Sequence, residues 1–176
     1  MPPDTANDNT LIRLGATVEA STLDGRFVRI EFVGPLTVDQ IDAARAAIPA
    51  ANLGIRAFVP HRQAIVLMHA WDVLMIVAND GQASLAGKTY ECLALRKPIL
   101  LIAPEGPATE LIRSTRAGSI ASPDDSVAIR EAAQQAMAMA GSAFVGASDD
   151  VLERYDRRRQ AERWSLLLEE AAGRIS

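Results

Sequence analysis

The chain alternates short apolar runs with longer segments in which apolar residues recur every three or four positions. Each short run ends at Gly, Pro, Asn or Asp, which is typical of a strand followed by a turn. The runs predict strands at 27–33, 55–59, 73–78, 99–103 and 119–121. Because helical segments separate them, the pattern predicts an α/β fold with a Rossmann-like parallel sheet and helices on both faces.

Several helical segments have recognisable starts and stops. Thr37 with Gln40 three residues later predicts a capping box for a helix over 38–50. Pro107 suits the first turn of a helix that ends near Arg116, with Gly118 as a left-handed stop. Either Asp124 or Asp125 is expected to cap the Ala-rich helix that ends at Ala140.

The C-terminal segment predicts one long amphipathic helix over 149–172. The positions expected to be buried on it are Val151, Leu152, Tyr155, Trp164, Leu167 and Leu168. The same helix carries Arg154, Arg157, Arg158, Arg159 and Arg163, which suit either contact with anionic lipid or a solvated face shared with Asp156 and Glu162. The solvated face is the favoured interpretation.

The stretch 11–15 is ambiguous between a strand and a helical remnant. A doubly wound sheet normally has its first strand in the middle, so we expect a strand here. The connection over 16–26 is then shorter than the dozen or more residues that a parallel crossover usually needs.

Length and composition limit the possible classes of protein. A chain of 176 residues with 49% hydrophobic content predicts one domain over 11–176, after a polar, disordered tail over 1–10. A net charge of −4 and 5% aromatic residues argue against nucleic acid as a partner. The apolar runs are too short to span a bilayer, so no integral membrane segment is expected, while peripheral attachment to the inner face of the membrane stays open. The single cysteine, Cys92, and the lack of a secretory signal predict a cytoplasmic protein.

The most informative loop runs from the buried strand at 73–78 through small residues into a helix that starts near Gly87. The amides of Gly87 and Lys88, with the helix dipole and the Lys88 charge, can bind a diphosphate without a metal. The Glu91 carboxylate, one turn later, can accept hydrogen bonds from two ribose hydroxyls. On spacing alone, a solvated first turn of the helix explains these residues equally well.

Two histidines offer little further chemistry. His61 follows Pro60 at a strand end, where contact with a base or sugar competes with the commoner helix-capping or solvated role. His69 is expected to be structural. With two His and one Cys, a metal site is not expected, and neither a Gly-x-Ser-x-Gly elbow nor a Walker loop is present.

The run 87–101, Gly-Lys-Thr-Tyr-Glu-Cys-Leu-Ala-Leu-Arg-Lys-Pro-Ile-Leu-Leu, resembles the donor-site segment of glycosyltransferase family 4. In that family a helix with the ribose-binding Glu leads through Lys-Pro or Arg-Pro into the next strand. Segments 30–34, 55–61 and 70–74 upstream, and 110–112, 117–118 and 123–125 downstream, follow the family's order. The resemblance covers about residues 27–172.

The resemblance implies the C-terminal half of a GT-B fold, which binds a nucleotide-sugar, UDP- or GDP-linked, and transfers the sugar with retention. It implies no cofactor and no metal for the chemistry. Glu91 would bind the ribose, Gly87 and Lys88 the diphosphate, and Phe58 and Val59 the base. The loop residues Ser84, Leu85 and Ala86 would complete the donor site. The acceptor would bind an N-terminal domain or a partner subunit, so the chain by itself is expected to be inactive.

Four positions depart from the family pattern. Ala83 replaces the first of two Glu residues that many members carry, and Thr17 and Glu19 stand where the family has an Arg and a Lys that clamp the diphosphate. Arg96 replaces the Gly usual at the end of the donor helix. The alternative hypothesis is therefore a non-catalytic nucleotide-binding or partner-binding module on the same fold.

Overall fold

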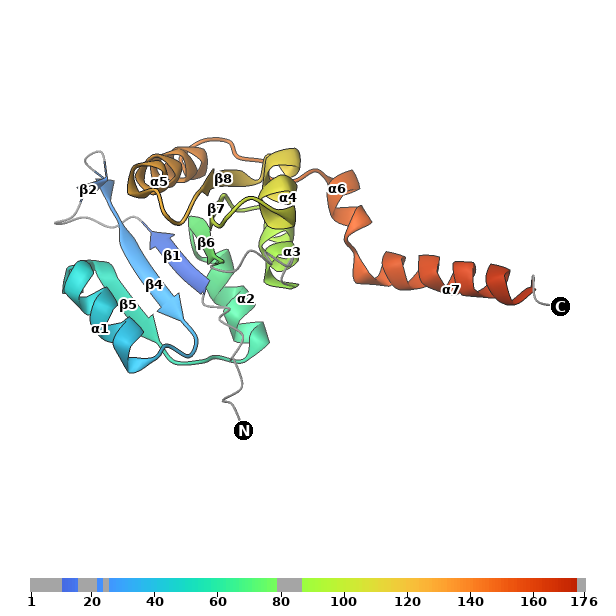
Figure 1. The fold of residues 1–176 in the computed structure, drawn as a ribbon, viewed down its shortest axis with the longest axis horizontal. Coiled ribbons are helices and arrows are strands. Elements are labelled where there is room, and N and C mark those ends of the chain that lie inside the picture. The colour runs from blue at the N-terminus through green and yellow to red at the C-terminus, as the bar shows by residue number, and fades with distance from the viewer. Residues whose placement is uncertain (1–10, 16–21, 24–25, 79–86, 174–176) are drawn as a thin grey trace.

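The computed structural model describes residues 11–15, 22–23, 26–78 and 87–173. Within them a six-stranded sheet has the order β5-β4-β1-β6-β7-β8 (Figure 1). A separate two-stranded ribbon pairs β2 with β3. The strands are β1 (Leu11–Gly15), β2 (Thr22–Leu23), β3 (Arg26–Phe27), β4 (Arg29–Val33), β5 (Leu53–Arg56), β6 (Val73–Val77), β7 (Ile99–Ile102) and β8 (Gly118–Ala121).

Every strand of the large sheet except β1 runs in one direction. Strand β4 is parallel to β5, β6 is parallel to β7, and β7 is parallel to β8. Both β4 and β6 are antiparallel to β1, which lies between them. This is the strand order of a Rossmann-like α/β fold, with the order reversing on either side of the first strand.

Residues 11–15 form a strand and occupy the expected central position, but their direction is a correction to the all-parallel sheet. The reason is the length of the connection: a parallel neighbour requires a crossover, usually a helix, whereas antiparallel strands can be joined by a short link. The described part of the link from β1 to β4 contains the β2–β3 ribbon. The chain therefore returns antiparallel to β1.

Helices lie on both faces of the sheet. They are α1 (Val38–Ala47), the 3-10 helix η1 (Ala50–Asn52), α2 (His61–His69), α3 (Gly87–Ala94), α4 (Pro107–Thr115), α5 (Ser126–Ala140), α6 (Asp149–Arg154) and α7 (Arg157–Gly173). Helices α2, α3 and α4 contribute to one apolar cluster with Leu74, Ile99 and Leu101 of the sheet. Helix α5 packs on the opposite face, against Val73 and Leu100. Each buried strand thus presents successive side chains to different helical layers.

The predicted helix signals are mostly confirmed, with one error. Thr37 and Gln40 form the capping box of α1, in which the backbone nitrogen of Gln40 lies 3.3 Å from the Thr37 hydroxyl oxygen. Asp125 caps α5, accepting from the amides of Val127 and Ala128. The left-handed residue after α4 is Arg116, with φ 52°, and not Gly118, which is already the first residue of β8.

Gly118 has a packing role that its backbone angle does not reveal. A Cβ at this position would lie 1.8 Å from the backbone oxygen of Ile99, its partner in the neighbouring strand. Only glycine allows the two parallel strands to approach this closely.

The strand expected at 27–33 is divided between β3 and β4, which belong to different sheets. Two other predicted elements end three residues earlier than expected. The strand expected at 55–59 is β5, Leu53–Arg56, because the segment after Arg56 leads directly into α2. The helix expected over 38–50 ends at Ala47, and Pro49 precedes the 3-10 turn η1. The residue before a proline is disfavoured in the helical region, which explains the early end.

The long C-terminal helix is interrupted at Tyr155 and Asp156. The Asp156 carboxylate accepts hydrogen bonds from the amides of Arg158 and Arg159, at 2.7 and 3.4 Å, and so caps a new helix, α7. Val151, Leu152 and Tyr155 pack against the core as expected. The prediction is wrong for three residues of α7, Trp164, Leu167 and Leu168, which are exposed by 63%, 48% and 65%.

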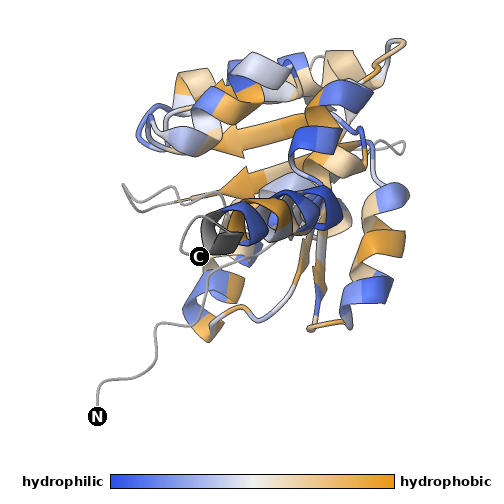
Figure 2. Cartoon of the chain, turned by 90° about the vertical axis from the view of Figure 1, so that its right-hand side faces the viewer, coloured by the Kyte–Doolittle hydropathy of each residue, from blue (hydrophilic) through white to orange (hydrophobic). Residues whose placement is uncertain are grey.

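These residues are exposed because α7 extends away from the rest of the chain (Figure 1). In Figure 2, where α7 faces the viewer, the helix carries both hydrophobic and hydrophilic positions. Among the residues the structure describes, no helix is both long and apolar enough to cross a membrane.

Candidate functional site

The candidate site lies at the carboxyl edge of the parallel strands. Strands β5, β6 and β7 share one direction, so the segments leading from them into α2, α3 and α4 all emerge at this edge. In open α/β sheets this edge binds ligands, above all where the strand order reverses. Here the reversal lies between β4 and β6, on either side of β1.

Glu91 of α3 and His61, the first residue of α2, come together at this edge. The distance from His61 Nε2 to Glu91 Oε1 is 3.0 Å. The Glu91 side chain is 31% exposed and that of His61 is 69% exposed. The carboxylate is therefore partly enclosed, points toward another element of the same edge, and stays accessible to a ligand that competes with the imidazole.

Lys88 lies one helical turn before Glu91 and is half-buried. Burial lowers the pKa of its ammonium group, and the negative charge of Glu91 partly opposes that shift. An ammonium group that is partly removed from water interacts more strongly with an anion than a fully hydrated one. Lys88 is thus suited to contact a phosphate beside Glu91.

Cys92, the next residue after Glu91, contributes to the core and not to the site. Its side chain is fully buried, and burial raises the pKa of the thiol to about 12. A thiol in that state is not a nucleophile at neutral pH.

The other expected donor-site residues have different placements. Gly87 is the first residue of α3, as expected, while Ser84, Leu85 and Ala86 lie outside the described residues. Val59 packs against the core cluster, and Phe58 is 74% exposed. Both precede His61 in the segment that leads from β5 into α2, so they belong to the same edge as Glu91.

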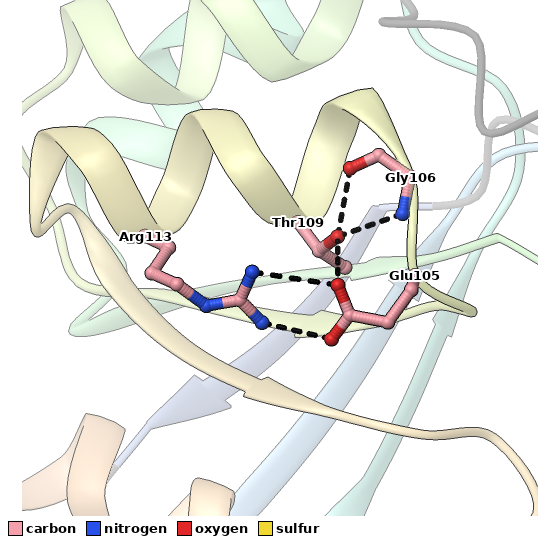
Figure 3. Close-up of polar contacts among 4 residues, drawn as sticks. All are labelled: Glu105, Gly106, Thr109 and Arg113. Atoms are coloured by element: carbon pink, nitrogen blue, oxygen red, sulfur yellow. Dashed lines mark hydrogen bonds and ion pairs between the residues drawn. The ribbon is translucent and has the colours of Figure 1, made fainter.

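A second strand-to-helix junction at this edge, between β7 and α4, was not singled out from the sequence. Its residues Glu105, Gly106, Thr109 and Arg113 form a closed network (Figure 3). The fully buried Thr109 hydroxyl accepts from the Gly106 amide at 2.9 Å and lies 3.1 Å from Glu105 Oε2. Arg113 donates to both carboxylate oxygens of Glu105, at 2.8 and 3.4 Å.

This network pairs the side chains of Glu105, Thr109 and Arg113 with one another and with the backbone of Gly106. The bonds from Arg113 and Thr109 lower the pKa of the Glu105 carboxyl group. The sequence signal was the spacing of Glu105, Thr109 and Arg113, which places the three on one side of a helix start.

Arg96 has a structural role that the sequence did not show. It lies two residues after the end of α3, in the left-handed region with φ 52°, where glycine is the favoured residue. The Arg96 guanidinium pairs with the Asp149 carboxylate and so links the end of α3 to the start of α6.

A surface hollow of about 290 Å³ lies on another side of α3, between it and α6. Tyr90, Leu93 and Tyr155 line it, and Lys88 and Glu91 do not. The rings of Tyr90 and Tyr155 are in contact, with centroids 5.0 Å apart. The hollow follows from the packing of α6 against α3 and is separate from the candidate site.

Comparison with known proteins adds no relative. No family model, curated protein or solved structure matches this chain. Within the described residues, no three His, Cys, Asp or Glu side chains gather as a metal site would require.

The candidate site has three polar groups of different chemistry. A partly enclosed carboxylate, a half-buried ammonium group and an imidazole lie along one edge, at the starts of two helices. The carboxylate can accept hydrogen bonds from neighbouring hydroxyl groups, and the ammonium group can bind an anion. Together they suit a ligand that carries a sugar next to a phosphate.

Proposed function

We propose that this chain is the nucleotide-sugar-binding half of a retaining glycosyltransferase, which transfers a sugar from a nucleotide donor to a glycan or lipid-linked acceptor in the cytoplasm. The observation that carries the proposal is the position of Glu91: its carboxylate is partly enclosed at the carboxyl edge of the sheet and is met there by His61. A carboxylate facing bulk water on an outer helix face would not support it.

In this proposal Glu91 accepts hydrogen bonds from the ribose hydroxyls, and the His61 imidazole moves aside or binds the ligand as well. Gly87 and Lys88, at the start of α3, contact the diphosphate. Positive charge and helix amides at that point stabilise the leaving diphosphate, which is electrostatic catalysis by groups already in place. An N-terminal acceptor domain or a partner subunit supplies the other side of the cleft.

The second candidate is a non-catalytic nucleotide-binding or partner-binding module, and one observation favours it. The resembling family uses basic residues after its first strand to clamp the diphosphate. Here β1 is antiparallel to β4 and β6, so it ends at Gly15 on the edge opposite to Glu91. Thr17 and Glu19, which stand in the place of those basic residues, lie outside the described residues.

Calorimetric titration of the full chain with UDP, GDP and ADP tests the proposal. We expect one of them to bind with a dissociation constant in the micromolar to millimolar range, as is typical of ligands with few contacts. Glu91→Ala should weaken that binding about tenfold or more, since hydrogen bonds to a charged group contribute roughly 1.5–3 kcal/mol.

Glu110→Ala is the matched control, because Glu110 is an exposed carboxylate in the first turn of α4, the neighbouring helix at the same edge. It should leave nucleotide affinity unchanged. Titration with the matching nucleoside separates the sugar contact from the diphosphate contact. Failure of all three nucleotides to bind, or equal effects of the two substitutions, would exclude a donor site at Glu91.

A further inference from the structure

Helix α7 is a separate structural feature with an unpartnered apolar side. It has 17 residues, about 25 Å of helix. Its start is fixed by the Asp156 cap and by an ion pair of 2.7 Å between Arg159 and Glu153 of α6. Beyond that point the helix extends away from the sheet (Figure 1).

The apolar side of α7 is a continuous stripe, which we define as Ala161, Trp164, Leu167 and Leu168. Residues three, four or seven positions apart share one side of a helix, so these four form a single surface. All four are exposed. Leu166 is exposed to the same extent as Leu168, 66% against 65%, but lies on the opposite side of the helix.

Charged residues border the stripe in a regular order. Arg158 and Glu169 are eleven residues, or about three turns, apart and border one side of it. Arg163 and Glu170 are seven residues, or about two turns, apart and border the other side. Each border therefore carries Arg nearer the start of α7 and Glu nearer its end.

We propose that the stripe is a homodimer interface, in which α7 packs antiparallel against α7 of a second copy. In this orientation Arg158 of one copy meets Glu169 of the other, and Arg163 meets Glu170, each pair occurring twice by two-fold symmetry. Both pairings place the symmetry axis within two residues of Ser165. In the parallel orientation Arg would lie beside Arg and Glu beside Glu, which is unfavourable.

The apolar residues agree with the same arrangement. With the axis near Ser165, Ala161 of one copy faces Leu168 of the other, so that a small side chain lies opposite a larger one. The two Trp164 side chains lie close to the axis. Large residues then pack at the centre of the interface, with charged residues at its border, as in other specific interfaces.

A membrane surface fits α7 less well than a second copy does. Helix α7 has seven charged residues, namely Arg157, Arg158, Arg159, Glu162, Arg163, Glu169 and Glu170. Four positive and three negative charges leave a net charge of only +1, whereas helices that bind anionic lipid have a large excess of Lys and Arg. In the proposed dimer, both the positive and the negative residues of α7 form pairs with the second copy.

The first test is sedimentation equilibrium of the full chain from about 1 to 200 µM. One helix per copy is a small interface, at the low end of the specific range of about 1,200 Å² or more, so we expect a micromolar dissociation constant. Leu168→Glu should weaken dimerisation at least tenfold, and Leu166→Glu, with the same change at equal exposure, should not. A wild-type chain that is monomeric throughout, or equal effects of the two substitutions, would overturn the proposal.

Charge reversal tests the border residues. The variants Arg158→Glu/Arg163→Glu and Glu169→Arg/Glu170→Arg should each be monomeric, because every pair across the interface becomes repulsive. An equimolar mixture of the two should form a heterodimer. A mixture that stays monomeric, or variants that dimerise like the wild type, would contradict the charge pairing.

Disulfide crosslinking tests the antiparallel orientation. An oxidised mixture of Ala161→Cys and Leu168→Cys chains should form a covalent dimer, and Ala161→Cys alone should not, because its two copies lie several residues apart along the helix pair. The native Cys92 is fully buried and should not react. Efficient crosslinking of Ala161→Cys with itself would indicate parallel helices and overturn the proposal.

Lipid binding is the remaining alternative outcome. Sedimentation with vesicles containing phosphatidylserine should leave the wild-type chain in the supernatant. Vesicle binding that Leu168→Glu abolishes, in a chain that is monomeric in solution, would assign the stripe to a membrane and overturn the dimer.

Discussion

Helices α3 and α4 both follow a parallel strand at the same edge of the sheet, yet their starts differ. At α4, the side chains of Glu105, Thr109 and Arg113 bond to one another and to Gly106, all within nine residues of the chain. At α3, the carboxylate of Glu91 reaches a different helix and contacts His61. The side-chain contacts of the first junction are local, while the second depends on a contact between residues that are 30 positions apart.

The difference shows why a helix start alone does not identify a binding site. Any helix has free amides in its first turn, and the polar side chains beside them can bond to one another or stay accessible to a ligand. At α4, an incoming anion would meet the Glu105 carboxylate. At α3, a half-buried ammonium group lies beside a carboxylate that an exposed imidazole contacts.

The largest expected effect is on the α4 junction. Thr109→Val removes a fully buried hydroxyl that serves both Gly106 and Glu105, and should lower the free energy of unfolding by about 1–2 kcal/mol. Urea denaturation measures this change. Thr109→Ser retains the hydroxyl and should be close to the wild type, whereas a fully stable Val variant would show that the network is dispensable.

A smaller effect is expected at the contact between His61 and Glu91. If the ribose competes with the imidazole for the carboxylate, His61→Ala should increase nucleotide affinity by up to about fivefold, since exposed ion pairs contribute at most roughly 1 kcal/mol. Calorimetry of the wild-type chain and the variant measures the gain, and lower affinity in the variant would make His61 a ligand contact instead.

The electrostatic link between Glu91 and Lys88 gives a spectroscopic prediction. The negative charge of Glu91 raises the pKa of Lys88 against the larger, lowering effect of burial. Glu91→Gln should therefore lower the pKa of Lys88 further. An NMR titration of the Lys88 side-chain carbon signals measures the shift, and an unchanged or raised pKa would show that the two groups are not coupled.

The smallest effect is expected at the exposed Glu105. Its pKa is lowered in the folded chain, so the carboxylate contributes stability above its ordinary pKa and loses that contribution as the pH falls through the folded value. Glu105→Gln should thus show a weaker loss of stability on acidification. Urea midpoints between pH 3 and pH 7 compare the two chains, and parallel curves would contradict the assignment.

The elements with strong local signals were predictable. Strands β6 and β7 are short, continuous apolar runs, which suit burial on both faces, and the Thr37 and Asp125 caps depend only on residues close in sequence. The direction of β1 was not predictable from its own five residues, since it depends on how β1 pairs with β4 and β6. The break before α7 was missed because Asp156 can either continue a helix or cap a new one.

The residues of the candidate site were likewise predictable only in part. Lys88 and Glu91 were identified by their spacing on one helix, which is a local property. The approach of His61 to Glu91 is a property of the sheet, because it depends on how α2 leads from β5 toward β6. Likewise, the exposure of Trp164 cannot be read from α7, since an apolar stripe predicts burial without stating what covers it.

The reversed β1 also determines where additional polypeptide can be attached. Leu11 lies beside Val33, at the carboxyl end of β4, so the chain enters the sheet at the edge that carries Glu91. In an all-parallel sheet the first strand would begin at the other edge. A fusion domain or affinity tag joined ahead of Leu11 therefore starts next to the proposed nucleotide site, and a C-terminal tag follows α7, away from it.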